Sequence, residues 1–289
     1  MWWLTCSLAL LLSCGLGGCR PARAVSRVEW TAMGTVAAVQ GRGDVSLAGA
    51  RQTAQEAFRR VEAEFSRFDP NSTLRRLGHV SAFGQPCWEA ATRLCAASDG
   101  AFNPTWRGAG DFDFGAIAKG FAVDVAAEAL CGAGDDLLVD LGGNVKAVRG
   151  DWTVGVRNPA DGGVAAVVAL RAGEALATSA EYFRGKHIRD GRTGRPVSNE
   201  VASVTVRCPS AMWADGLSTT LFVLGVDSGK RFLRERLPDL VDSNVAVSVL
   251  WILRSGCKVW YNTRHGEDEA DHVRRDGLRA DSCGERLLR

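Results

Sequence analysis

The stretch "CPSAMWADGLSTTLFVLG", residues 208–225, predicts one helix that is apolar around almost its whole circumference. Ser210 is a preferred residue before a helix start, and Gly225 is a preferred residue after a helix end. A helix with so little polar surface is normally buried. Asp215 nevertheless lies inside it, with Thr219 one turn later on the same face. Because an unpaired buried carboxylate is costly, Asp215 needs a partner.

Two kinds of partner for Asp215 fit this pattern equally well. A carboxylate and a hydroxyl four residues apart offer two hard oxygens to one cation. Magnesium suits such a pair, because it fills the rest of its shell with water or diphosphate oxygens. Alternatively, loop amides donate to Asp215 while Thr219 bonds back to its own helix. The helix taken alone leaves both interpretations open.

The elements around this helix follow one another without regular alternation of strand and helix. This order predicts an α+β fold, a single domain of mixed sheets packed with helices, rather than a doubly wound sheet. The patterns predict helices over 47–64, 88–98, 113–130, with Asp113 as N-cap, and 227–237. They predict strands within 27–41, 135–150, 151–159, 162–180 and 203–209, and a hairpin over 245–262.

Composition restricts the class of protein. Of the 289 residues, 46% are hydrophobic and 24% are charged, as in a soluble globular enzyme. The formal net charge of +2 is too small for bulk attraction to nucleic acid or to an anionic membrane. We therefore expect no nucleic-acid partner.

The first residues predict export. Residues 1–18 are apolar and uncharged, which is typical of a signal peptide, although no Lys or Arg precedes the run. The segment Leu16-Gly17-Gly18-Cys19 resembles the bacterial lipobox, whose cysteine receives a lipid when the preceding peptide is removed. A lipid on Cys19 would anchor the protein on the periplasmic side of a bacterial membrane. A plain signal peptide that is cut elsewhere is the alternative.

The remainder of the chain predicts a tether over 19–30, one domain over 31–265 and a charged tail over 266–289 that we expect to be disordered. No C-x-x-C pair is present, so neither a zinc knuckle nor a thioredoxin-type redox site is predicted. Disulfide pairing and buried free thiols are both consistent with the cysteines beyond the lipobox. These are Cys87, Cys95, Cys131, Cys208, Cys257 and Cys283.

Three segments are suited to a close approach between backbone and ligand. Residues 113–120, "DFGAIAKG", place small residues and Lys119 at a helix start, which favours a phosphate, although such starts more often serve packing. Residues 139–144, "VDLGGN", predict a tight turn. Residues 187–194, "HIRDGRTG", place His187 near Asp190, as in a base or a phosphate contact.

Nine segments, taken in their order along the chain, resemble the ApbE family, the FAD:protein FMN transferases. The match runs from about Met33 to Asn262, and nine segments in one order are specific where each alone is not. The segments are "AMGT", "FSRFDPNSTLRRL", "GAFNPT", "DFGAIAKGFAVD", "DLGGN", "VGVRNP", "ALATSAEY", "HIRDGRTGRPV" and "SVTVRCPSAMWADGLSTTLFVLG".

The resemblance implies a T-fold-like α+β domain that binds FAD and magnesium (Mg²⁺) outside the cytoplasm. Members of the family transfer the FMN part of FAD to a Ser or Thr hydroxyl of an acceptor redox protein and release AMP. Certain relatives instead hydrolyse FAD to FMN and AMP. A third interpretation is a lipid-tethered protein that carries FAD without catalysis.

The resemblance also assigns residues. Asp215, Thr219 and the backbone carbonyl of Ala116 match the metal site, and His187 matches a histidine for acid–base or phosphate handling. Magnesium and Lys119 would balance the charge of the diphosphate while the acceptor hydroxyl attacks the FMN phosphorus. The positions that match contacts to the flavin nucleotide are Met33, Phe68, Ala101, Phe102, Asn103, Asp113 and Lys119.

The chain departs from the family pattern in three places. Asn103 stands where the family usually has Asp. "HIRDGRTG" lacks the proline of the usual "DPRTG" and has Arg189 at a usually apolar position. The stretch between "ATSAEY" and "KHIRD" is shorter than is typical, which predicts a trimmed strand pair over the flavin.

Overall fold

The predicted buried helix is the first part of α5 (Ala211–Glu235) in the computed structural model, which describes residues 24–43, 46–133, 136–181, 185 and 187–264. The Ser210 hydroxyl accepts a hydrogen bond from the Trp213 amide and caps the helix, as predicted. At Gly225 the backbone leaves the helical conformation, with φ 75° and ψ −172°, which glycine adopts without strain. A kink therefore joins the two predicted helices into one element.

Eight strands form one antiparallel sheet, in the order β1-β2-β3-β4-β7-β8-β9-β10. Alternate residues of a strand face opposite sides of the sheet. Ala175 and Ala177 accordingly lie in the core on the helical side, while Leu176 lies in a second core. The strands are β1 (Val25–Ala32), β2 (Thr35–Arg42), β3 (Leu137–Leu141), β4 (Asn144–Ala147), β7 (Ala175–Ala180), β8 (Val201–Cys208), β9 (Ser248–Leu253) and β10 (Lys258–Asn262).

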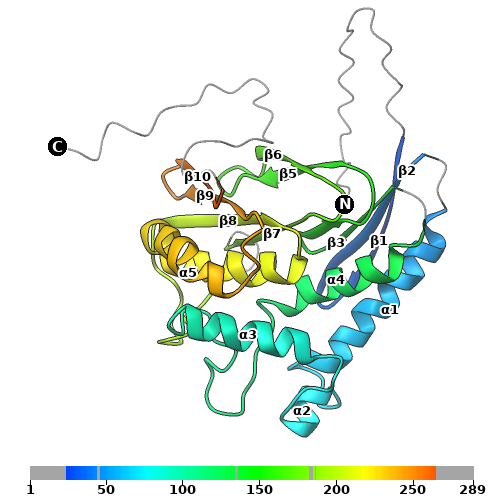
Figure 1. Cartoon of the computed structure of the whole chain (residues 1–289). Helices are drawn as coiled ribbons and strands as arrows, with labels where there is room; N and C mark the ends of the chain where they lie inside the picture. Colours follow the sequence, from blue (N-terminus) through cyan, green and yellow to red (C-terminus); the bar gives the residue numbers. More distant parts are fainter. Residues whose placement is uncertain (1–23, 44–45, 134–135, 182–184, 186, 265–289) are drawn as a thin grey trace, which may run out of the picture.

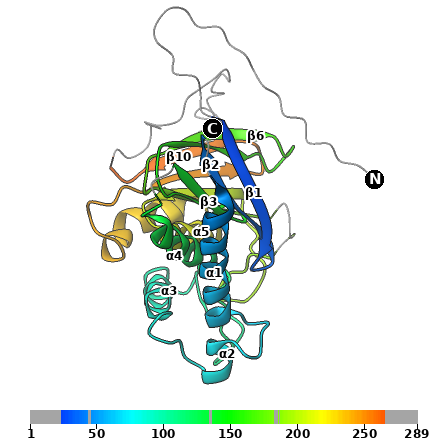
Figure 2. The same cartoon turned by 90° about the vertical axis from the view of Figure 1, so that its right-hand side faces the viewer.

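A layer of helices covers one face of this sheet (Figures 1 and 2). Helices α1, α4 and α5 pack directly against the strands, and α3 packs against α5 on the side away from the sheet. Trp251, Phe58 and Phe222 are fully buried between these layers. The other helices are α1 (Leu47–Phe65), α2 (Thr73–Leu77), α3 (Gln85–Ala97), α4 (Ala118–Leu130) and a 3₁₀ helix (Leu237–Asp239).

A two-stranded ribbon of β5 (Trp152–Arg157) and β6 (Val164–Leu170) contributes the second core. Trp152 and Leu170 of the ribbon are buried there with Leu250 and Ile252 of β9, which face away from the helices. The central strands are therefore buried on both faces. The predicted α+β fold is confirmed, with every pairing in the main sheet antiparallel.

Three local predictions near ligand segments are wrong. Met33 and Gly34 have φ of 47° and 70° and form a turn, so 27–41 holds two strands instead of one. Strand β1 begins at Val25, so residues 25–30 belong to the sheet rather than to a tether. Helix α4 begins at Ala118 and not at Asp113, because the Asp113 carboxylate accepts the Gly115 amide in a turn ahead of the helix.

The described cysteines contain no disulfide: Cys87, Cys95, Cys131, Cys208 and Cys257 are all free thiols. Within the described residues, no helix combines the length and the apolarity that a membrane span needs. The predicted signal peptide, Cys19 and the tail over 266–289 lie outside the described residues.

Candidate functional site

Helices α4 and α5 come into close contact at Gly120. A Cβ atom at this position would lie 2.2 Å from the Ala211 carbonyl oxygen and 2.7 Å from the Asp215 Cβ. Both distances are shorter than real Cβ contacts, so only glycine fits here. The contact places the first turn of α4 beside the first turns of α5, and so beside Asp215.

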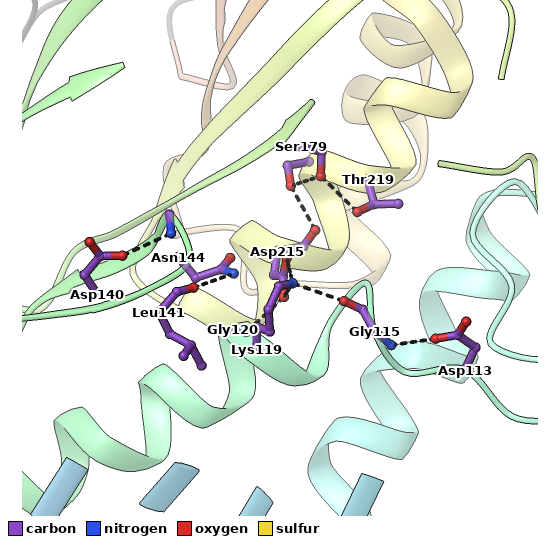
Figure 3. Close-up of polar contacts among 12 residues, drawn as sticks. Asp113, Gly115, Lys119, Gly120, Asp140, Leu141, Asn144, Ser179, Asp215 and Thr219 are labelled. Atoms are coloured by element: carbon purple, nitrogen blue, oxygen red, sulfur yellow. Dashed lines mark hydrogen bonds and ion pairs between the residues drawn. The ribbon is translucent and has the colours of Figure 1, made fainter. Parts of the chain in front are cut away.

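Asp215 is paired by the residues around Gly120 (Figure 3). Asp215 is 5% exposed, and its Oδ2 accepts a hydrogen bond from the Gly120 N–H at 2.9 Å. Lys119 Nζ lies 3.4 Å from both carboxylate oxygens and 3.1 Å from the Gly115 carbonyl oxygen, to which it donates. A backbone donor and a cation therefore offset the cost of burying this charge. The amide that pairs Asp215 comes from a helix rather than from a loop.

The carbonyl oxygen of Ala116 accepts no hydrogen bond among the described residues. In a helix that continued backwards from α4, the Gly120 N–H would donate to the carbonyl of Ala116, four residues earlier. That N–H donates to Asp215 instead, and among the described residues no hydrogen bond ends on the Ala116 carbonyl. The pairing of Asp215 thus frees a second oxygen at the same place.

A chain of hydroxyls continues from Asp215 to Thr219. Ser218 donates to the Asp215 carbonyl at 2.9 Å, Ser179 of β7 lies 2.8 Å from the Ser218 hydroxyl, and Thr219 lies 3.0 Å from Ser179. Thr219 therefore points to the sheet and does not bond back to its own helix. The hydroxyls that do so are those of Ser218 and Thr220.

Asp124 fixes the start of α5 from one turn further along α4. Its carboxylate accepts four hydrogen bonds from the start of α5 and from β4, which complement the positive end of the helix dipole. The donors are the amides of Ala211 and Met212 at 3.0 and 2.9 Å, the Ser210 hydroxyl at 2.7 Å and Lys146 Nζ at 2.7 Å. The arrangement holds the helix that carries Asp215 against the helix that carries Lys119.

Two turns with predicted ligand roles lie together. A Cβ at Gly142 would be 2.5 Å from the Thr35 hydroxyl, so the Gly-Gly turn packs directly on the turn that holds Met33. Asp140 closes the Gly-Gly turn by accepting the Gly143 amide at 3.0 Å, and burial raises the pKa of its carboxyl. Asn144 follows this turn and points toward Asp215 in Figure 3.

The loop of residues 101–103 is joined to the loop that follows His187. Ala101 and Phe102 are buried at 1% and 3% exposure, so their side chains pack in the core. Asn103 donates through Nδ2 to the Gly191 carbonyl at 3.1 Å, and a Cβ at Gly191 would lie 2.5 Å from the Asn103 Cβ. The amide that replaces the usual Asp therefore has a structural role between the two loops.

Two predicted flavin contacts lie at the edge of the cluster. Asp113 accepts a hydrogen bond from the Gly115 amide and pairs with Arg67 at 3.5 Å, and so connects the loop before α4 to the segment that follows α1. Phe68 is 80% exposed, with the Arg67 guanidinium 4.0 Å from its ring centre. The exposed ring is accessible to a ligand. No interaction among the described residues joins Phe68 to Asp215.

His187 is also exposed. Its Nδ1 lies 2.9 Å from the Gly185 carbonyl oxygen, which can only accept, so Nδ1 carries the hydrogen and Nε2 holds the lone pair of the neutral ring. Among the hydrogen bonds of the described residues, none joins His187 to Asp215, Thr219 or Lys119. The structure brings the predicted metal residues and Lys119 together, and it leaves His187 outside that cluster.

The sequence does not predict four residues as members of this cluster. Asp124 and Ser179 come close to α5 only in the folded chain, and their signal in the sequence is a polar residue within an otherwise apolar run. Ser218 lies in the run Ser218-Thr219-Thr220, where the helical period alone does not select it. The pattern of residues 139–144 predicts Asn144 only as part of a tight turn.

The oxygens gathered here fit a magnesium ion. No group of three or more His, Cys, Asp or Glu side chains capable of holding a metal occurs among the described residues. Magnesium needs only one or two carboxylates together with neutral oxygens. Asp215, Thr219 and the free Ala116 carbonyl supply such a set beside the cationic Lys119.

Comparison with known families shows what the segment that carries this cluster is similar to. The sequence model of the ApbE family matches residues 107–241, which include both Lys119 and the Asp215–Thr219 pair. Over this region, which is just under half of the chain, the sequence is similar to the ApbE family.

Particular relatives carry the name FAD:protein FMN transferase. The protein of Klebsiella pneumoniae (strain 342) is 38% identical over 136 residues, 44% of this chain and 43% of the relative. That of Treponema pallidum (strain Nichols) is 38% identical over 146 residues, 43% of this chain and 40% of the relative. The chain thus spans less than half the length of these curated relatives.

Solved structures share the fold over most of the chain. The flavin transferase ApbE from Vibrio cholerae is 22% identical with a TM-score of 0.68, over 83% of this chain and 97% of that one. The ApbE protein from Thermotoga maritima is 22% identical with a TM-score of 0.70, over 81% and 96%. At this identity the likeness concerns the fold, and it supports the ApbE-like architecture described above.

Proposed function

We propose that this protein is a magnesium-dependent FAD:protein FMN transferase, which moves FMN from FAD to a Ser or Thr hydroxyl of an acceptor redox protein. The observation that carries the proposal is the buried Asp215 beside Lys119, Thr219 and the unused Ala116 carbonyl. The names of the relatives at about 38% identity point to the same activity.

The reaction breaks the bond between the FMN phosphorus and the oxygen of AMP, and forms a bond from that phosphorus to the acceptor oxygen. The acceptor hydroxyl loses its proton, and AMP leaves with the bridging oxygen and the electron pair. Asp215, Thr219 and Ala116 would hold the magnesium ion, which supplies charge neutralisation for the diphosphate. Lys119 adds a second positive charge on the same side.

The other residues of the site position these groups. Gly120 and Asp124 fix α4 against α5, so the charges that face the diphosphate need little reorganisation during the reaction. His187 is the proposed base for the acceptor proton, because its exposed Nε2 lone pair is accessible to a second protein. Met33, Phe68 and Asp113 are proposed contacts to the flavin nucleotide.

The proposed location is the periplasmic side of a bacterial membrane, with a lipid on Cys19 as anchor. Cys19 and the preceding signal sequence carry this part of the proposal, and it is independent of the site. Metabolic labelling with a radioactive fatty acid tests it: the wild-type chain should carry the label and Cys19→Ala should not. An unlabelled wild-type chain would contradict the anchor.

One incubation separates the proposed function from its alternatives. The full chain in detergent is mixed with FAD, Mg²⁺ and a candidate acceptor, after which intact-protein mass and free nucleotides are measured. An acceptor that gains one FMN with release of AMP supports the transferase. Free FMN with AMP and an unmodified acceptor indicates a hydrolase, and intact bound FAD indicates a carrier; either result contradicts the proposal.

A further inference from the structure

The carboxamide of Asn144 has a buried oxygen without a partner. Asn144 is 3% exposed, and its Oδ1 accepts no hydrogen bond among the described residues. Its Nδ2 donates to the Leu141 carbonyl at 3.3 Å. That bond fixes the orientation of the amide, because a flipped amide would place Oδ1 against another carbonyl oxygen. A buried oxygen in this state destabilises the protein unless a ligand or ion uses it.

The register of β4 places this oxygen at the Asp215 cluster. Lys146, two residues after Asn144, reaches Asp124 of α4 at 2.7 Å, so Asn144 faces the same helix. Gly120 lies one turn before Asp124 on the same face of α4, and its amide donates to Asp215. Strand β4 packs against both α4 and α5. Figure 3 shows the Asn144 carboxamide directed toward Asp215 and Lys119.

The charges around Asn144 determine which kind of ligand its carboxamide oxygen can bind. A carboxamide oxygen directed at a carboxylate is repelled unless a positive charge lies between them. The nearby ammonium of Lys119 is engaged by Asp215 and Gly115 rather than by Asn144. A cation that binds between Asp215 and Asn144 would use both oxygens and remove the repulsion.

We propose that Asn144 Oδ1 is a fourth protein oxygen for the divalent cation, in addition to Asp215, Thr219 and the Ala116 carbonyl. The inference rests on the proposed function, since it concerns the same cation. It also explains how a site with a single carboxylate holds magnesium: the remaining ligands are neutral oxygens whose positions the fold fixes. Asn144 thereby sets cation affinity without adding charge that would repel the diphosphate.

Cation binding without FAD tests this role directly. Mn²⁺ is titrated into the full chain in detergent and followed by calorimetry and by the loss of the free-Mn²⁺ electron paramagnetic resonance signal. Asn144→Leu keeps the size of the side chain and removes the oxygen, so its Mn²⁺ affinity should fall about tenfold or more. Asn144→Asp keeps an oxygen in place and should bind Mn²⁺ at least as tightly as the wild type.

A matched control lies on the other face of the sheet. Ser203 is fully buried, and its hydroxyl also has no hydrogen-bond partner among the residues that the structure describes. It alternates with Val204, which faces the helices. Ser203→Ala should therefore leave the Mn²⁺ affinity unchanged. Thermal unfolding without metal shows whether each variant is folded.

The outcomes distinguish this inference from the proposed function. Wild-type Mn²⁺ affinity in a folded Asn144→Leu variant would overturn the inference, whether or not FAD affinity falls. If the wild type binds no Mn²⁺ and therefore does not differ from Asp215→Ala, both the metal part of the proposed function and this inference are overturned. A loss confined to Asn144→Leu and Asp215→Ala supports both.

Discussion

At the scale of single residues, the burial of Asp215 is the observation on which the chemistry depends. Its carboxylate accepts a hydrogen bond from the Gly120 amide, and both of its oxygens lie 3.4 Å from the Lys119 ammonium. An acid with only these partners is well paired without ligand yet retains capacity for a cation. The sequence indicated that Asp215 needs a partner, but only the fold shows that Gly120 supplies it.

Asn103 gives a residue-scale prediction that differs from the family pattern. Asn103→Asp restores the residue that the family usually has, but it replaces the donor to the Gly191 carbonyl by a carboxylate that only accepts. We expect a loss of about 1–3 kcal/mol in the free energy of unfolding, measured by urea denaturation. A variant as stable as the wild type would show that the bond between the two loops contributes nothing.

At the scale of elements, the crossing of α4 and α5 builds the site. Gly120→Ala would force its Cβ into the Ala211 carbonyl and separate the two helices, so we expect a loss of several kcal/mol and weaker Mn²⁺ binding. Gly49→Ala in α1 is the control, because a Cβ there meets nothing within 4 Å. It should gain up to about 1 kcal/mol from helix propensity. Equal effects of the two substitutions on thermal unfolding would contradict the packing argument.

Asp124 gives a second prediction for the same pair of helices. In Asp124→Asn, the side-chain amide would face donors from α5, so at least one of the four hydrogen bonds is lost. We expect the free energy of unfolding to fall by about 1–3 kcal/mol, and Mn²⁺ affinity to fall with it because α5 carries Asp215. Lys146→Met removes the ammonium but leaves the contacts to α5, and should have the smaller effect on Mn²⁺ affinity. Calorimetry on both variants measures the difference; unchanged Mn²⁺ affinity in Asp124→Asn would refute the positioning role.

At the scale of the whole molecule, local pattern predicted the elements better than their contacts. The apolar run of α5 and its cap at Ser210 follow from local preferences, and both are present, whereas the helix end predicted at Gly225 is a kink within α5. The turn at Met33 was missed because a positive φ at a residue other than glycine has no local signal. Asn144 and Asp124 reach α4 and α5 through strand register and helix packing, which single-sequence periodicity does not encode.

Packing of the whole molecule also predicts the reactivity of its thiols. Burial raises the pKa of the Cys87 thiol, and it raises that of Cys208 to about 12. Because the thiolate is the reactive form and its fraction is negligible far below the pKa, neither thiol should react with iodoacetamide at pH 8. Cys131 is exposed and should react. Peptide mapping of native and urea-unfolded protein tests this; rapid labelling of Cys208 in the native protein would contradict the described core.

The central claim is that Asp215 holds the cation on which transfer depends. The most direct measurement is the intact mass of an acceptor protein after incubation with FAD, Mg²⁺ and either the wild type or a folded Asp215→Ala variant. We predict one added FMN with the wild type and none with the variant, together with loss of Mn²⁺ binding by the variant. Undiminished FMN transfer by Asp215→Ala at the same Mg²⁺ concentration would contradict the account.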